Sequence, residues 1–102
     1  MSVTPSYSLE RVKELVRLDA YRITMQARRD ARESGFDERD LLACVLGLES
    51  RDFHKTMPST RFSAHMQDVY RPRVEGRDLY VKVQIVGTSH EALTVVISFK
   101  DR

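Results

Sequence analysis

The 102-residue sequence contains no tryptophan, one cysteine, three prolines and four glycines. Its single cysteine, Cys44, excludes an internal disulfide, and the surrounding apolar run LLACVLGL predicts a buried, reduced thiol. No apolar run is as long as a membrane helix, and the N-terminus shows no charged-then-apolar signal segment. We therefore expect a cytoplasmic protein that does not bind a membrane.

Several kinds of functional site also lack their signature residues. His54, His65 and His90 have neither the close spacing nor the neighbouring cysteines of a zinc site, which predicts a protein without a metal or another cofactor. There is no glycine-rich phosphate loop, no nucleophile motif and no pair of carboxylates suited to two metal ions. His54 and His65 could act as acid or base, although a histidine without a visible partner is more often surface.

Basic residues are abundant, and most of them are arginine. The net charge is +2, and 13 of the 17 basic residues are arginines, whose planar guanidinium suits phosphate. Residues 51–102 carry nine basic and six acidic side chains, whereas residues 1–50 carry eight and nine. This asymmetry weakly favours an anionic partner for the C-terminal half.

Hydrophobic periodicity predicts helices first and a sheet afterwards. Helices are predicted over residues 8–19, 24–34 and 37–48, capped by Ser8, Thr24 and Asp37. The third helix should be the most buried, and the second should be thin and exposed. Strands are predicted over residues 20–23, 52–57, 67–73, 79–86 and 92–100. The expected architecture is one α+β domain over residues 1–102, with helices on one face of a small, mainly antiparallel sheet.

Alternation along the last two strands assigns their side chains to opposite faces of the sheet. The predicted inward residues are Leu79, Val81, Val83, Ile85, Leu93, Val95, Ile97 and Phe99. Tyr80 and Lys100 then share the uncovered face, where a phenol and an ammonium can position and polarise a phosphate. Outward tyrosines and lysines are also ordinary solvent-facing residues.

The two middle strands are harder to assign. Phe53 and Met57 have the same parity as Lys55, so the inward face of strand 52–57 stays ambiguous. Pro72 cannot donate a hydrogen bond, so it makes strand 67–73 an edge strand or ends its pairing nearby.

A metal-free surface with Tyr, Gln, Lys and Arg suits RNA, because the 2′-hydroxyl is a nucleophile already beside the phosphorus. Cleavage then requires a base, cations for the phosphorane charge and an acid for the leaving 5′-oxygen. From these residues alone, a generic binding module remains the more common explanation.

Five segments of the sequence resemble the MqsR-type toxins, the mRNA interferases of bacterial toxin–antitoxin pairs. They are LERVKELV, VLGLESRDF, DFHKTM, QDVYRPR and VVISFKDR, and they follow the family's order over nearly the whole chain. The resemblance implies a RelE-like fold and a ribosome-independent endoribonuclease that cleaves single-stranded mRNA at GCU-like sites. It also implies an MqsA-type antitoxin partner, a zinc-binding helix-turn-helix protein.

The resemblance also implies roles for individual residues. The family's functional positions fall on Lys55, Gln67, Tyr80 and Lys100. Our hypothesis is that Lys55 and Lys100 stabilise phosphorane charge, that Tyr80 positions the phosphate or transfers a proton, and that Gln67 orients the ribose or a base edge.

Three further cations, Arg71, Arg73 and Lys82, are expected to bind RNA phosphates. Arg73 could instead pair with Asp68 or Glu75. The general base is left open, because lysine and tyrosine are ordinarily protonated at pH 7.

The sequence departs from the family pattern at His54, where a tyrosine is expected, and at Met66, where a tryptophan is expected. The segment GTSHEA also lengthens the last hairpin. The GCU preference is therefore less secure than RNA cleavage itself. The alternatives are a ribosome-dependent interferase, a catalytically idle RNA- or antitoxin-binding protein of the same fold, and a small adaptor without a nucleic-acid partner.

Overall fold

Three α-helices occupy the first half of the chain in the computed structural model, which describes residues 4–59 and 65–102. They are α1 (Leu9–Arg17), α2 (Met25–Glu33) and α3 (Glu38–Leu46). Each begins where predicted, because the preceding side chain accepts a hydrogen bond from a first-turn amide that has no partner within the helix. Ser8, Thr24 and Asp37 are these caps.

Two apolar residues at helix ends lie outside the core. Leu18, which follows α1, is 67% exposed, and Met25 at the start of α2 is 80% exposed. The expectation that α3 is the most buried helix is wrong. It has two buried residues, Leu41 and Val45, whereas α1, of the same length, has three. Cys44 is half-buried, and burial raises the pKa of its thiol.

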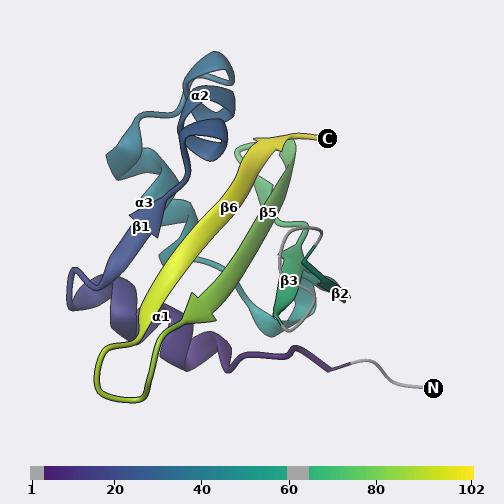
Figure 1. Cartoon of the computed structure of the whole chain (residues 1–102). Coiled ribbons are helices and arrows are strands. Elements are labelled where there is room, and N and C mark those ends of the chain that lie inside the picture. The colour runs from purple at the N-terminus through teal and green to yellow at the C-terminus, as the bar shows by residue number, and fades with distance from the viewer. Residues whose placement is uncertain (1–3, 60–64) are drawn as a thin grey trace.

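The described residues form a six-stranded sheet with the order β1-β6-β5-β3-β2, and β4 pairs with the start of β5. Its strands are β1 (Tyr21–Ile23), β2 (Phe53–Pro58), β3 (Met66–Tyr70), β4 (Arg73–Val74), β5 (Arg77–Val86) and β6 (Leu93–Asp101). A 3₁₀ turn, η1 (Ser50–Asp52), leads into β2. β1 runs parallel to β6, and the other pairs are antiparallel. In Figure 1, β5 and β6 run side by side through the middle of the molecule, with β1 next to β6. The predicted α+β architecture is confirmed.

The helices cover one face of the sheet and form the core with it. The buried residues of this core include Val12, Val16, Ala27, Ala31, Leu41, Val45, Tyr70, Leu79, Val81, Val83, Val96 and Phe99. Thr94 is also fully buried, and its hydroxyl donates a hydrogen bond to the carbonyl oxygen of Val12 at 3.0 Å. This buried hydroxyl is therefore satisfied inside the protein.

Pro72 ends the pairing of β3 and does not make β3 an edge strand. β3 stops at Tyr70 and lies between β2 and β5, so β2 is the edge on this side of the sheet. The amide of Arg71 donates to the carbonyl oxygen of Asp52 at 2.7 Å, and the carbonyl of Pro72 accepts from the amide of Leu79 at 3.0 Å. Of the two predicted consequences of Pro72, the end of pairing is confirmed and the edge position is wrong.

A β-bulge interrupts the pairing of β5 with β6. Lys82 pairs with Ser98, but the next residue, Val83, pairs with Val96, so Ile97 is an extra residue in β6. The carbonyl oxygen of Ile97 accepts a hydrogen bond from the hydroxyl of Thr24 at 2.9 Å. The bulge is thus fixed to the start of α2.

This bulge reverses the faces predicted for the first part of β6. Thr94 and Val96 are fully buried, whereas Leu93 and Val95 are only half-buried. The prediction that Leu93 and Val95 point inward is wrong, because it assumed unbroken alternation. Phe99, beyond the bulge, is buried as predicted.

A second bulge decides the face of Lys55, which the sequence left ambiguous. Phe53 pairs with Tyr70 and Lys55 pairs with Val69, so His54 is the extra residue in β2. The ring of Phe53 packs against that of Tyr70 on the core face, with 5.6 Å between the ring centroids. Lys55 therefore points to the opposite face.

Candidate functional site

Strand register places three lysines on the face of the sheet opposite the helices. Lys55, Val69, Lys82 and Ser98 form one row across β2, β3, β5 and β6, and residues directly opposite one another share a face. Lys100 lies two residues beyond Ser98 on the same face. The chain has four lysines, and three of them lie here. We call this surface the lysine face; it comprises Lys55, Gln67, Val69, Tyr80, Lys82, Gln84, Ser98 and Lys100.

Tyr80 lies next to two of these lysines. It pairs with Lys100 across β5 and β6, and the Lys100 Nζ atom is 5.5 Å from the centroid of its ring. The Nζ atom of Lys82 is 5.9 Å from the same centroid. Both distances lie within the range in which an ammonium is attracted to an aromatic ring. The prediction that Tyr80 and Lys100 share one face is confirmed.

The lysine face carries positive charge without a matching carboxylate. In residues 4–59 and 65–102 every ion pair is formed by an arginine, and Lys55, Lys82 and Lys100 take part in none. Lys82 is half-buried, and its pKa is lowered by burial and by the positive charges of Lys100 and Lys55. Uncompensated charge of this kind attracts anions such as phosphate.

Gln67 is held in one orientation by Gln84. The Nε2 atom of Gln67 donates to the Oε1 atom of Gln84 at 3.2 Å, and the two residues are 8% and 7% exposed. Lys55 and Lys100, by contrast, are exposed. The predicted uncovered face is therefore open at these lysines and closed around the amide pair. Sequence reasoning missed the role of Gln84, although its parity with Lys82 pointed to the same face.

Strand pairing places Arg73 at one end of the lysine face. Arg73 lies opposite Asp78, and its Nη1 atom is 3.9 Å from the Oδ1 atom of that residue. Arg102 approaches the same oxygen at 3.5 Å. Asp78 precedes Tyr80 by two residues, so the three charged groups continue the same face. Arg71 is exposed and follows the end of β3, so strand pairing does not bring it to this group.

Asp68 lies on the core face and is fully buried there. Its Oδ1 and Oδ2 atoms accept hydrogen bonds from the backbone amides of Ser6 and Tyr7, both at 2.9 Å. The carboxylate therefore anchors the segment before α1 to β3. The suggested pairing of Arg73 with Asp68 or Glu75 is wrong, since Arg73 of β4 pairs with Asp78 of β5.

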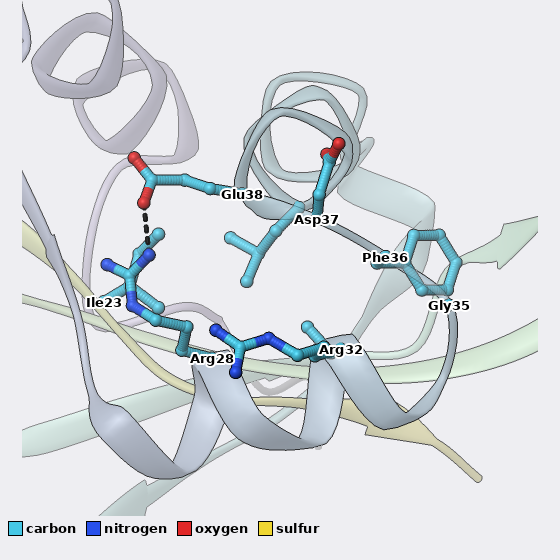
Figure 2. A pocket seen from close by; sticks show the side chains of 9 residues that line it. Ile23, Arg28, Arg32, Gly35, Phe36, Asp37 and Glu38 are labelled. Atoms are coloured by element: carbon cyan, nitrogen blue, oxygen red, sulfur yellow. Dashed lines mark hydrogen bonds and ion pairs between the residues drawn. The ribbon is translucent and has the colours of Figure 1, made fainter.

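A cavity of about 430 Å³ lies between α2 and the start of α3, and none of the predicted site residues lines it. Figure 2 shows Arg28 and Arg32 of α2 on one side of this cavity and Asp37 and Glu38 on the other. Arg28 forms an ion pair with Glu38. The apolar part of the cavity wall consists of Ile23, Ala31, Phe36 and Leu41. Because charges of both signs meet here and partly pair, the cavity does not offer the excess positive charge of the lysine face.

The described ranges contain no group of three or more histidine, cysteine or acidic side chains that could hold a metal ion. His54, His65 and His90 are exposed and lie in different parts of the fold. Helices long and apolar enough to cross a membrane are likewise not found among these residues.

Comparison with known proteins assigns the chain to a family. A family model described as "Motility quorum-sensing regulator, toxin of MqsA" matches residues 4–101. The chain belongs to this MqsR toxin family. One member, the mRNA interferase toxin MqsR of Escherichia coli strain K12, is 37% identical over 101 residues, which cover 97% of this chain and 96% of that protein. The resemblance found in the sequence is confirmed, and the observed architecture is consistent with the RelE-like fold expected of the MqsR family.

In this MqsR-family chain, the segments that carry the resemblance also build the lysine face. DFHKTM supplies Lys55, QDVYRPR supplies Gln67 and the closing SFK supplies Lys100. Tyr80 joins them from the middle of the sheet. The four residues predicted to be catalytic therefore lie on one face, although they come from four different strands.

Proposed function

We propose that this protein is the toxin of a toxin–antitoxin pair and acts as an mRNA interferase, an endoribonuclease that cleaves single-stranded mRNA. The observation that carries this proposal is the group of three lysines on the face that also carries Tyr80, with Lys82 and Lys100 beside its ring. In the described part of the chain none of the three has a carboxylate partner. A phosphodiester supplies the negative charge that this surface lacks. The relative from Escherichia coli, named as an mRNA interferase toxin, supports the same activity.

The proposed reaction is an attack of the RNA 2′-hydroxyl on the neighbouring phosphorus, which requires no metal ion. Lys55 and Lys100 stabilise the charge that develops on the phosphorane oxygens. Tyr80 positions the phosphate and donates a proton to the leaving 5′-oxygen. Gln67, whose amide is fixed by Gln84, orients the ribose or a base edge. The products are a 2′,3′-cyclic phosphate and a 5′-hydroxyl.

Phosphates on either side of the cleaved bond are expected to contact Arg71, Arg73 and Lys82. Arg73 lies at the Asp78 end of the lysine face, so it suits a flanking nucleotide better than the reacting one. We further propose ribosome-independent cleavage at GCU-like sites, and neutralisation by an MqsA-type antitoxin that binds zinc and contains a helix-turn-helix. The family description, which names the toxin of MqsA, supports this partner.

The test incubates purified protein with a defined mRNA in EDTA and maps the new RNA ends. We expect cuts that leave 2′,3′-cyclic phosphates, a loss of about 10²–10³-fold in rate for Lys55→Ala and Tyr80→Phe, and full activity for Lys13→Ala. Lys13 is the matched control because it is the one lysine outside the lysine face.

Different failures of this test have different meanings. Intact free RNA together with cleavage of translated mRNA would indicate a ribosome-dependent enzyme. Intact RNA in both cases, with normal antitoxin binding, would indicate a catalytically idle member of the family. Activity that EDTA abolishes would contradict the metal-independent mechanism.

A further inference from the structure

Lys82 occupies the middle of the lysine face. It lies on β5, with Val69 and then Lys55 on one side of its row and Ser98 on the other. Neighbouring strands are about 4.8 Å apart, so the backbones of Lys55 and Lys82 are separated by about 10 Å. A phosphodiester placed between these side chains and Lys100 would lie within reach of all three amines.

The proposed function leaves open which group removes the proton from the 2′-hydroxyl. We propose that Lys82 is this general base, and that it receives the proton on its Nζ atom as the O2′–phosphorus bond forms. The assignment rests on the proposed function and adds a catalytic role to a residue that would otherwise only bind phosphate.

Among the described residues, the charged groups that face Lys82 disfavour its protonated form. Lys55 faces it from β2 and Lys100 from β6, while β3 contributes only uncharged side chains to this face. On its own strand the nearest titratable group is Tyr80, and Asp78 beyond it is engaged by two arginines. Burial and the two positive neighbours lower the pKa of Lys82. Among these lysines it is the half-buried one, whereas Lys55 and Lys100 are exposed.

No other residue of the lysine face is as well suited to accept a proton. Its defining residues include no carboxylate and no histidine, and the amide side chains of Gln67 and Gln84 are not bases at neutral pH. Asp68, on the adjacent position of β3, lies on the core face with both oxygens bound to backbone amides.

The proton balance of the step is closed within the site. The O–H bond of the 2′-hydroxyl breaks and its proton moves to Lys82, while the electron pair left on O2′ forms the new bond to phosphorus. The bond between phosphorus and O5′ breaks, and O5′ receives a proton from the hydroxyl of Tyr80. The new ammonium of Lys82 then returns a proton to the Tyr80 oxygen, directly or through water, so both residues regain their starting forms.

The decisive variant is Lys82→Arg, which keeps a positive charge and hydrogen-bond donors but removes the ability to accept a proton. We expect the single-turnover cleavage rate to fall by about 10²–10⁴-fold, with RNA binding nearly unchanged. Lys13→Arg is the matched control, because Lys13 lies on α1, outside the lysine face. The same exchange at that position should leave the cleavage rate unchanged.

The pH dependence provides a second readout. The rate of the wild-type protein should rise with pH through the lowered pKa of Lys82, since the neutral amine is the active form. The residual cleavage by Lys82→Arg should lack this rise. If arginine disturbs folding, Lys82→Cys in a Cys44→Ala background, alkylated with bromoethylamine, supplies an amine less basic than lysine. The rise should then move to lower pH.

Two results would overturn the assignment. The first is a Lys82→Arg variant that cleaves RNA about as fast as an active wild-type protein, and the second is an alkylated variant whose pH dependence does not move. A wild-type protein that leaves RNA intact would instead contradict the proposed function and, with it, the base.

Discussion

The two faces of the sheet differ in whether their charged side chains are paired within the protein. On the core face, each carboxylate oxygen of Asp68 accepts a hydrogen bond from a backbone amide, and the hydroxyl of Thr94 donates a hydrogen bond to a carbonyl oxygen of α1. On the lysine face, three ammonium groups lie close together with no carboxylate partner in the described chain. These core-face groups are therefore satisfied within the protein, whereas the three lysines of the opposite face form no ion pair among the described residues.

Substitutions on the two faces should therefore have different effects on stability and on activity. A core-face residue contributes to stability and should be silent in catalysis except through unfolding. Removing an exposed lysine of the lysine face should cost little stability, because like charges close together do not stabilise the fold.

The largest expected contrast is between Phe99 and Lys100. Phe99→Ala should lower the free energy of unfolding by about 3–5 kcal/mol, because the buried ring that packs on Phe36 leaves a cavity. Lys100→Ala should change stability by less than about 0.5 kcal/mol but reduce RNA cleavage by about 10²–10³-fold. Urea denaturation and cleavage assays measure both. Equal destabilisation by the two variants would erase the proposed distinction between the faces.

The next contrast is between two aspartates. Asp68→Ala should cost about 1–3 kcal/mol, since it removes the acceptor of two backbone amides. Asp78→Ala should cost less than about 1 kcal/mol, because its ion pairs with Arg73 and Arg102 are long and partly exposed. Release of these arginines should also tighten RNA binding and steepen its salt dependence. Weaker RNA binding by Asp78→Ala would show that Asp78 orients these cations productively.

A smaller effect is expected from Gln84→Leu. This change removes the hydrogen bond that fixes the side chain of Gln67. The cleavage rate should fall by about 10-fold, which corresponds to about 1.4 kcal/mol, the size of one hydrogen bond. The double variant Gln67→Ala/Gln84→Leu is the control. If Gln84 acts through Gln67, the double variant should be no slower than Gln67→Ala alone. Additive losses would assign Gln84 a separate role.

The smallest effect concerns stability and pH at Lys82. The lowered pKa of Lys82 means that its protonated form destabilises the fold. Lys82→Met should therefore raise the free energy of unfolding by about 0.5 kcal/mol, after allowance for solvent screening. That corresponds to about 2–4 °C in Tm for a domain of about 100 residues. The cost is fully present below the folded pKa and disappears as the pH rises from this value to the ordinary lysine pKa. Thermal melts of both proteins should therefore converge at alkaline pH; a constant gap would exclude this electrostatic origin.

The sequence predicted the elements well because their signals are local. Ser8, Thr24 and Asp37 each cap a helix through a side chain and an amide three residues apart, so the sequence contains the whole interaction. The prediction that Tyr80 and Lys100 share a face was also correct, because the two residues pair directly across β5 and β6 on the same side of the bulge.

The failures arose where pairing with a distant strand decides the outcome. The bulges at His54 and Ile97 insert one residue each, and alternation along a single strand cannot reveal an extra residue. Alternation therefore assigned the wrong faces to Leu93 and Val95 and left Lys55 undecided. The contact between Gln67 and Gln84 also depends on register, because their strands pair with each other only through the folded sheet.

The hydrogen bond from Thr24 to the bulged Ile97 separates the β5–β6 turn from the end of β6 that carries Lys100. It attaches the part of β6 between the β5–β6 turn and Lys100 to the start of α2, a helix outside this hairpin. Residues can be inserted or deleted in the turn without displacing Lys100, because the register restarts at this anchor. Changes in the length of the turn should therefore leave the pairing of Lys100 with Tyr80 intact.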